Sequence, residues 1–499
     1  MAQCLDSSQK PPRASFLKLL REQLLEYSAL PLRQNVSYWD LRAQSWLSRH
    51  REIMIVDADK NLGDVLILRS DIVSACRKLV HESYDSVTRE EASACVEKCK
   101  KQLAAILDSC RADSIPTADK RGLQAVFSKT GLGTFRCLVK LHKTPIKFRP
   151  ISNLGPSWCN SLAIWCCSVL REVQDKLPWI VTNTQQVLHK LKYLRIPDDY
   201  VLATIDVTNL YPSVIHKHLF QQLRSRIIEY GADSVAKIAV DILLVVFQGS
   251  LIEFEGHSWQ PRQGIPTGTS PGVVVANVYL DGLDKWLVSA GLRVLEYMRF
   301  VDDTLLVIHR ADVSRALSVL NSWHPSIQFE TVAVGREGIP YLDLNLSIVG
   351  DTIAYQTHRK EQNGYLYLPR GSCHPSGVFG GLVKGEAIRL RRTNDTAAKY
   401  QEALRFFEQK LSQRGYSISW IRQVASSSSQ VRKRGEVATT TRKAFLKVTW
   451  SSALNERFLR MCLARNGAVL SQAIGPHSFV LAKAVQRNLF RLRYGQWRM

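Results

Sequence analysis

The sequence contains no long apolar run. The longest mostly apolar segment, from Ala239 to Phe247, is interrupted by Asp241. A helix that spans a bilayer needs about 20 consecutive apolar residues. The first 20 residues also lack the continuous apolar segment of a secretory signal peptide. We therefore expect no membrane partner and no passage through the secretory pathway.

Closely spaced cysteine pairs are absent as well. The eleven cysteines are scattered and include no CxxC pair; Cys95 and Cys99 lie one helical turn apart, and Cys166 and Cys167 are adjacent. This pattern indicates neither a zinc site nor a disulfide framework. We expect reduced, partly buried thiols, as in the cytosol or the nucleus.

Acidic residues are few relative to basic ones, with 44 Asp and Glu against 67 Lys and Arg and a net charge of +23. The shortage is most marked in residues 421–499, which hold 15 Lys and Arg but only 2 Asp and Glu. A hydrophobic content of 45% nevertheless excludes a mostly disordered protein. The charge favours a nucleic-acid partner.

Two basic clusters stand out in this C-terminal region: Arg432, Lys433 and Arg434, followed by Arg442 and Lys443. Their spacing is typical of a two-part nuclear import signal, and such clusters also bind nucleic acid. A solvated basic face of a helix is the alternative. We expect the protein to act in the nucleus after synthesis in the cytoplasm.

The length allows two to four domains. Residues 1 to about 55 and 71–112 have a helical period, and helices are also predicted at 216–230, 270–288 and 395–416. Short β-rich segments are predicted at 201–207, 294–300 and 304–310, and the serine-rich 425–430 is typical of a linker. Strands in hairpin-like pairs among helices predict an α+β fold.

Three aspartates follow these predicted strands. Asp302 and Asp303 lie between 294–300 and 304–310, where a solvated turn would be the ordinary interpretation, and Asp206 lies near the end of 201–207. If the strand ends adjoin, clustered carboxylates are unfavourable unless a divalent cation binds them. Two metal ions roughly 3.5–4 Å apart can activate a hydroxyl and stabilise a leaving oxygen in phosphoryl transfer.

The loop 261–271 between the carboxylate segments is rich in glycine and proline and leads into an apolar helix, with Ser270 as its expected N-cap. Such a loop lets the backbone approach a base or a phosphate closely. It lacks the Gly-Lys-Ser/Thr of a Walker A loop.

These segments resemble the palm motifs of reverse transcriptases, in the same order: Asp206 to Tyr211, Gln263 to Pro271 with looser spacing, and Phe300 to Asp303. Further blocks resemble those of Penelope-like retroelement reverse transcriptases. They are 59–63, 140–143, 148–151, 340–344, 372–375, 385–389 and 413–416. The resemblance extends over roughly residues 55–420.

The resemblance implies a right-hand polymerase of fingers, palm and thumb, with an antiparallel palm sheet and a helical thumb. Residues 1–55 would form a basic helical extension, 56–200 the fingers with the first part of the palm, 201–350 the palm, and 351–499 the thumb and basic C-terminal region. The implied activity is RNA-directed DNA polymerase, which extends a DNA primer on an RNA template with dNTPs.

The resemblance also implies the roles of site residues. Asp206 and Asp302 would hold two Mg²⁺ ions, with Mn²⁺ as a substitute, beside Asp303 and the Val207 carbonyl. The triphosphate would bind to basic side chains through charge-assisted hydrogen bonds, and the base pair and sugar would meet the remaining nucleotide-binding residues. The residues that bind the triphosphate would be Lys140, Lys143 and Arg149. The residues that meet the base pair and the sugar would be Gln263, Gly264 and Tyr211, and Tyr211 would exclude ribonucleotides.

Departures from the family narrow the resemblance. No GIY-YIG endonuclease pattern follows Tyr416, and the sparse acids after residue 343 do not suit an RNase H site. The closer likeness is the endonuclease-deficient branch, which is associated with chromosome ends. Lys360-Glu361-Gln362 replaces the family's Lys-Pro-Thr, and the sequence identifies no lysine as general acid.

An RNA-directed RNA polymerase and a catalytically inactive, domesticated RNA-binding protein are the alternatives; the intact aspartates argue against the second.

Overall fold

The computed structural model describes residues 38–60, 62–110, 114–141, 144–231, 234–266, 271–360, 363–372 and 374–427, and the backbone of 442–450 and 477–485. The chain divides into two compact units. The larger comprises 52–364 and 393–399, and the smaller takes its described residues from 1–51, 365–392 and 400–497. Within these described ranges, no helix is long and apolar enough to cross a bilayer.

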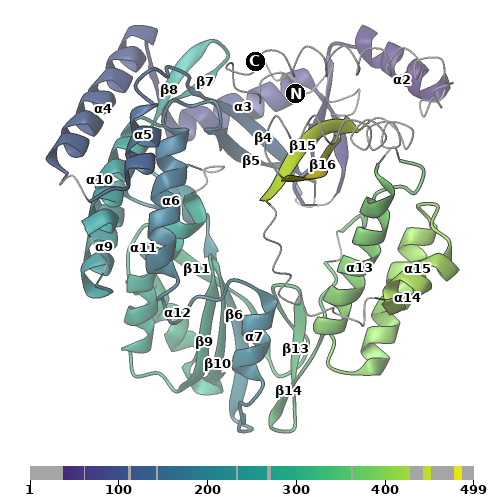
Figure 1. The fold of residues 1–499 in the computed structure, drawn as a ribbon. Helices are drawn as coiled ribbons and strands as arrows, with labels where there is room; N and C mark the ends of the chain where they lie inside the picture. The colour runs from purple at the N-terminus through teal and green to yellow at the C-terminus, as the bar shows by residue number, and fades with distance from the viewer. Residues whose placement is uncertain are drawn as a thin grey trace. The chain divides into compact units, whose positions relative to one another are not determined.

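A four-stranded antiparallel sheet, here called the central sheet, organises the larger unit (Figure 1). Its strand order is β11-β6-β10-β9, and each neighbouring pair is antiparallel. The strands are β6 (Tyr200–Thr208), β9 (Val294–Phe300), β10 (Asp303–His309) and β11 (Gln328–Gly335). The predicted strands at 201–207, 294–300 and 304–310 are therefore confirmed, and the α+β class with them.

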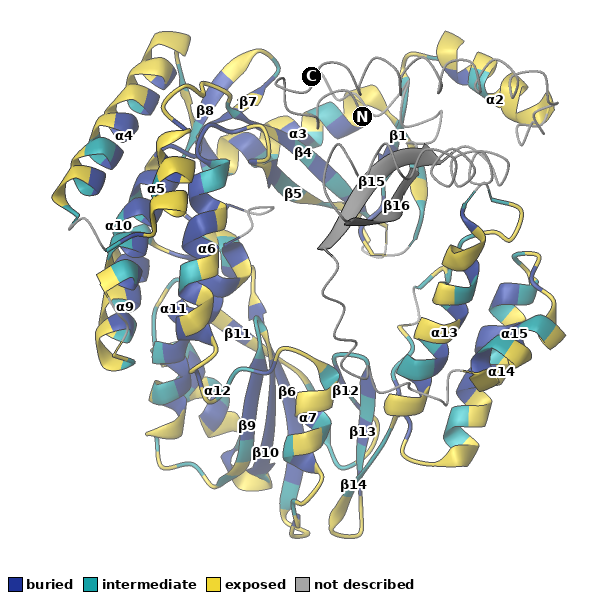
Figure 2. Ribbon diagram, in the orientation of Figure 1, coloured by how far each residue is buried: buried dark blue, intermediate teal, exposed yellow. Residues whose placement is uncertain are grey.

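The middle strands β6 and β10 are buried on both faces of the central sheet, because their successive apolar side chains point alternately to the two faces. On one face, Ala203 and Ile205 of β6 join a core with helices. These are α6 (Asn160–Gln174), α9 (His216–Glu229), α10 (Ser234–Gln248), α11 (Gly272–Val288) and α12 (Val313–Ser322). On the other face, Leu202 and Leu305 meet α7 and a small sheet. The elements there are α7 (Thr184–Leu191), β12 (Ile339–Tyr341), β13 (Leu344–Val349) and β14 (Thr352–Thr357). Figure 2 shows strands β6 and β10 of the central sheet as largely buried.

A second sheet has five strands in the order β3-β8-β7-β4-β5. They are β3 (Tyr84–Val87), β4 (Gly133–Lys140), β5 (Lys147–Asn153), β7 (Ile252–Phe254) and β8 (His257–Pro261). The short hairpin of β1 (Ile53–Asp57) and β2 (Asp64–Leu68) precedes them in the chain. An isolated bridge between Ala58 and Val139 connects the end of this hairpin to β4.

The predicted helical segment 71–112 is wrong in one respect. It contains two helices, α3 (Arg69–Ser83) and α4 (Arg89–Ser109), with strand β3 between them. A capping box of Thr88 and Glu91 starts α4. Tyr84 of β3 is buried and pairs with Pro261 of β8, so the strand is held by a partner remote in sequence. The helix α5 (Thr117–Gln124) follows.

The N-terminal prediction of helix to about residue 55 is also wrong at its end. Helix α2 (Tyr38–Arg49) is present, but β1 begins at Ile53 because its apolar run pairs with β2; residues 1–37 lie outside the described ranges. None of the eight cysteines in the described residues forms a disulfide bond. The division into fingers, palm and thumb stays a prediction.

The smaller unit contains a cluster of three helices. These are α13 (Ser376–Arg392), α14 (Ala397–Ser412), which confirms the predicted helix at 395–416, and α15 (Ile418–Ser426). Val383, Phe407 and Ile421, one from each helix, are buried in one core. Ala425 is buried in the same core. Because α15 extends to Ser426, the predicted linker at 425–430 begins inside a helix.

The C-terminal region contributes two strands that pair in parallel, β15 (Arg442–Trp450) and β16 (His477–Val485). Arg442 and Lys443 are the first residues of β15, so the alternative of a basic helix face does not apply to them. Arg432, Lys433 and Arg434 lie outside the described residues.

Candidate active site

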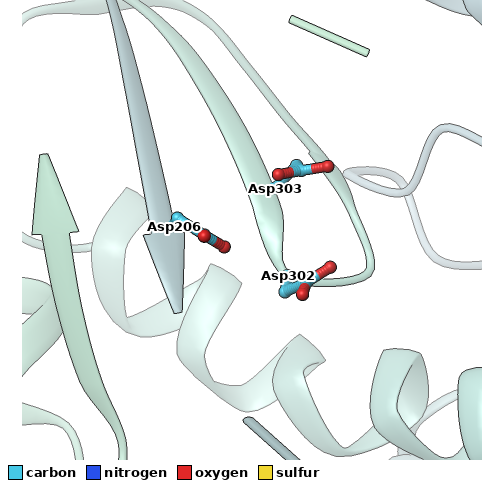
Figure 3. Close-up of side chains that lie close together, drawn as sticks. All are labelled: Asp206, Asp302 and Asp303. Carbon is cyan, nitrogen blue, oxygen red and sulfur yellow. The ribbon is translucent and has the colours of Figure 1, made fainter. Parts of the chain in front are cut away.

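Three aspartates meet at one end of the middle strands of the central sheet (Figure 3). Asp206 lies on β6, Asp302 in the turn between β9 and β10, and Asp303 at the start of β10. Since β10 pairs with β6, with Thr304 opposite Ile205, the turn lies beside Asp206. One carboxylate oxygen from each aspartate lies within 4.8 Å of the others.

Asp206 is electrostatically strained in this position. Its Oδ1 atom is buried and has no hydrogen-bond partner. Desolvation raises the pKa of its carboxyl, the negative charges of Asp302 and Glu330 add to the rise, and a backbone hydrogen bond from Val207 opposes it. Glu330 acts from the neighbouring strand, where it lies opposite Asp206 in the β6–β11 register.

Asp303 shows the same strain. Desolvation, followed by the charges of Asp302 and Asp206, raises the pKa of its carboxyl to about 6, while the positive charge of Lys360 opposes the rise. A divalent cation would relieve this repulsion and give the buried Asp206 Oδ1 a partner. Magnesium prefers carboxylate oxygens, so these three residues fit a magnesium site.

The turn that carries Asp302 is held by neighbours that the sequence analysis did not single out. The hydroxyl of the buried Thr304 donates a hydrogen bond to the Ile205 carbonyl at 2.6 Å, and this bond connects β10 to β6 next to the site. Arg299 donates to the Val301 carbonyl at 2.8 Å. Arg299 and Thr304 both lie within three residues of Asp302, and that position in the sequence was the available signal.

A glycine-containing segment packs beside the site. The Gly264 N–H donates to the Val214 carbonyl and the Ile265 N–H to the Tyr211 carbonyl, both at 2.8 Å. Tyr211 belongs to the short helix α8 (Leu210–Ser213), which comes directly after β6, and Val214 is the residue that follows this helix. Gly264 has a φ of +89°, and a Cβ there would lie 2.8 Å from the Tyr211 carbonyl oxygen. Only glycine suits both conditions.

The predicted nucleotide-binding residues Tyr211, Gln263 and Gly264 are therefore brought together. The Gln263 side chain donates to the Pro212 carbonyl at 3.5 Å. Desolvation and the nearby charge of Asp302 raise the pKa of Tyr211 to about 12. Tyr211 thus lies within the electrostatic reach of the carboxylate cluster. Ser270, the expected N-cap, is outside the described residues, and Pro271 precedes α11.

Two of the predicted triphosphate-binding residues lie on a different sheet from the aspartates. Lys140 ends β4 and Arg149 lies on β5, both in the five-stranded sheet. The guanidinium of Arg149 is 3.2 Å from the Asp59 carboxylate; the Arg149 side chain is 49% exposed and that of Asp59 only 5%. Lys143 lies outside the described residues. Arg149 therefore combines a buried anchor with an exposed charge.

The fold and the site define an α+β protein whose central antiparallel sheet carries three clustered aspartates at a hairpin turn. Carboxylates so placed are suited to binding divalent cations for phosphoryl transfer.

Comparisons with known proteins cover different parts of the chain. Residues 366–425, which include α13 to α15, match the animal helix-turn-helix domain family, and no curated protein matches the chain. Telomerase from Candida albicans, solved with a TWJ fragment of telomeric RNA, is similar at 11% identity over 83% of this chain and 77% of that one, with a TM-score of 0.49. Apo telomerase from Candida tropicalis is similar at 10% identity over 92% and 81%, with a TM-score of 0.43.

Proposed function

We propose that this chain is an RNA-directed DNA polymerase. The observation that carries the proposal is the cluster of Asp206, Asp302 and Asp303 on adjoining strands, with carboxylate oxygens within 4.8 Å of one another and a buried oxygen without a partner. The order of the sequence motifs supports it, because the segment with Gly264 packs on the turn that follows Asp206.

The proposed roles follow from these positions. Asp206, Asp302 and Asp303 would hold two Mg²⁺ ions, with the Val207 carbonyl as a further ligand; metal binding there would supply activation of the primer 3′-hydroxyl and stabilisation of the leaving pyrophosphate. Tyr211 lies in helix α8 directly after β6, where the charge of Asp302 acts on it, and would contact the incoming sugar. Lys140, Lys143 and Arg149 would neutralise the triphosphate, and Gln263 and Gly264 would contact the nascent base pair.

The finer part of the proposal is the type of polymerase. We infer an endonuclease-deficient Penelope-like reverse transcriptase, which acts in the nucleus on an RNA template with a DNA primer and dNTPs. The central sheet would belong to the palm, the strands β3, β4 and β5 to the fingers, and α13 to α15 to the thumb. The motif blocks between residues 59 and 416 support this assignment.

The test is primer extension by the purified full chain on a primed RNA template with Mg²⁺, with dNTPs and rNTPs in parallel reactions. Asp302→Asn removes charge at the metal site. A loss of about 4 kcal/mol of transition-state stabilisation would lower the rate about 10³-fold. Primer–template binding should change little, because affinity comes mainly from Lys and Arg contacts to phosphates.

A matched control is Asp351→Asn. Asp351 is an aspartate of the same unit whose side chain is 60% exposed and pairs with the exposed Arg195 at 3.2 Å. This variant should extend primers at the wild-type rate. Wild-type extension by Asp302→Asn would refute the metal assignment, and a preference of the wild-type protein for rNTPs would refute the DNA polymerase assignment.

A further inference from the structure

A fully buried ion pair lies under the turn that carries Asp302. Arg299 and Asp284 are both 0% exposed. Two hydrogen bonds join them, from Arg299 Nε to Asp284 Oδ1 at 2.8 Å and from Nη2 to Oδ2 at 2.7 Å. Burying two charges carries a large desolvation penalty, and apolar residues of similar volume often stabilise a protein as well or better. Stability alone therefore does not account for this pair.

The rest of the guanidinium connects helix α11 to the turn. Its Nη1 atom donates to the Val301 carbonyl at 2.8 Å and to Asn277 Oδ1 at 3.1 Å, and Nη2 donates to the Asn277 carbonyl at 3.2 Å. Asn277 is itself held by Gln174 of α6 at 2.9 Å. Arg299 thus joins a rigid, buried part of the core to one backbone carbonyl of the hairpin.

That carbonyl belongs to a residue in an unfavourable conformation. Val301 has a φ of +59°, in the left-handed region that β-branched residues rarely adopt. Asp302 follows it directly, so the orientation of the peptide between Val301 and Asp302 determines where the Asp302 carboxylate points. The bond from Arg299 is a charge-assisted hydrogen bond, which is stronger than a neutral one and can hold this conformation.

We propose that Arg299, anchored by Asp284, is a positioning residue that fixes the peptide between Val301 and Asp302 and thereby holds Asp302 in place beside Asp206. The proposal rests on the proposed function in that the positioned carboxylates would hold the metal. Arginine is required because its planar fork reaches Asp284 and Val301 in different directions at once, whereas the single ammonium of lysine does not.

The first experiment compares Arg299→Lys with Arg293→Lys. Arg293 makes a similar two-bond pair, with Asp312 at 2.8 and 3.0 Å, but it precedes β9 at the end remote from the turn and is 52% exposed. In the metal-free proteins, Arg299→Lys should speed hydrogen exchange of the hairpin amides at least about tenfold. It should weaken Mn²⁺ binding, measured by the free-ion electron paramagnetic resonance signal, by a similar factor. Arg293→Lys should leave both within about twofold.

A second variant separates positioning from stability. Arg299→Met with Asp284→Leu and Tyr297→Phe replaces by apolar residues the pair and the buried Tyr297 hydroxyl that donates to Asp284 at 2.6 Å, which should keep the fold but removes the donor to Val301. We expect a urea midpoint at or above that of Arg299→Lys together with weakened Mn²⁺ binding. Adding Val301→Asn, which tolerates the left-handed conformation, should restore most of the Mn²⁺ affinity.

The outcomes distinguish the two proposals. Normal Mn²⁺ binding and hairpin exchange in both Arg299 variants would overturn the positioning role, even if the wild-type protein extends primers. Recovery of Mn²⁺ affinity in the apolar variant along with stability would also overturn it, since a purely structural role predicts that result. Arg299-dependent Mn²⁺ binding without any primer extension would refute the proposed function and leave the positioning role intact.

Discussion

Gly264→Ala tests the close packing of the glycine segment against α8. The alanine would have to adopt a φ of +89°, and its Cβ would lie 2.8 Å from the Tyr211 carbonyl oxygen and 3.0 Å from Pro212 Cα. Both neighbours are backbone atoms, so no side chain can rotate away. The backbone must shift, and the two 2.8 Å hydrogen bonds that join this segment to α8 and Val214 must weaken.

The expected size follows from two contributions. A non-glycine residue in the left-handed conformation costs about 1–2 kcal/mol, and overpacking against fixed atoms costs about 1–3 kcal/mol. The free energy of unfolding should therefore fall by about 2–5 kcal/mol. Gly256→Ala is the matched control, because Gly256 has a φ of +77° in the turn between β7 and β8 but nothing within 4 Å of its Cβ position. It should lose only the first contribution, about 1–2 kcal/mol.

Urea denaturation of the two variants and the wild-type protein measures both values, since a change in midpoint at constant slope reports a change in stability. The reduced chain entropy of the unfolded state on replacing glycine by alanine is common to both variants and cancels in their difference. Equal destabilisation by the two substitutions would refute the close approach of Gly264 to Tyr211.

The remaining predictions concern selectivity, pH and the basic region. Tyr211→Ala should lower the dNTP preference, as the ratio of kcat/KM for dNTP and rNTP, at least tenfold, or about 1.4 kcal/mol; equal losses for both sugars would restrict Tyr211 to a structural role. Since the pKa of Asp303 is raised to about 6, its contribution to the stability of the metal-free protein falls as pH rises from the ordinary carboxyl range through about 6. The rise in Tm on adding Mg²⁺ should therefore grow over that window and flatten in Asp303→Asn; a pH-independent Mg²⁺ effect would contradict this. Removal of 428–499, which leaves α15 whole, should weaken duplex binding and reduce the salt slope by about 0.9 for each lost phosphate contact; an unchanged slope would place the binding surface elsewhere.

Much of the central sheet was predictable because its strands carry a local signal. The segments that form β6, β9 and β10 are short and apolar, and the two adjacent aspartates mark a hairpin turn. The helices α9, α11 and α14 follow the 3.6-residue period of apolar side chains, and this period can be recognised within a short stretch of sequence. Strand β3 has only four residues, and its partner β8 lies more than 170 residues away, so no window could reveal it.

The candidate site shows the same division. The sequence by itself determined the candidate residues of the site: Asp206, Asp302 and Asp303 at strand ends, and Gly264 in a glycine- and proline-rich loop. Only the tertiary structure decided that the carboxylates lie within 4.8 Å of one another and that Glu330 faces Asp206 across β6 and β11.

The tertiary structure alone also placed Arg299 against Asp284 of α11 and the Val301 carbonyl. Local sequence shows an arginine within a strand, and an arginine there is ordinarily expected at the surface. Its burial depends on strand register and on the packing of a helix 15 residues earlier in the chain. Register and burial arise from contacts between distant segments, and for that reason the chemistry of this site can be inferred from the sequence, whereas the means of holding it in place cannot.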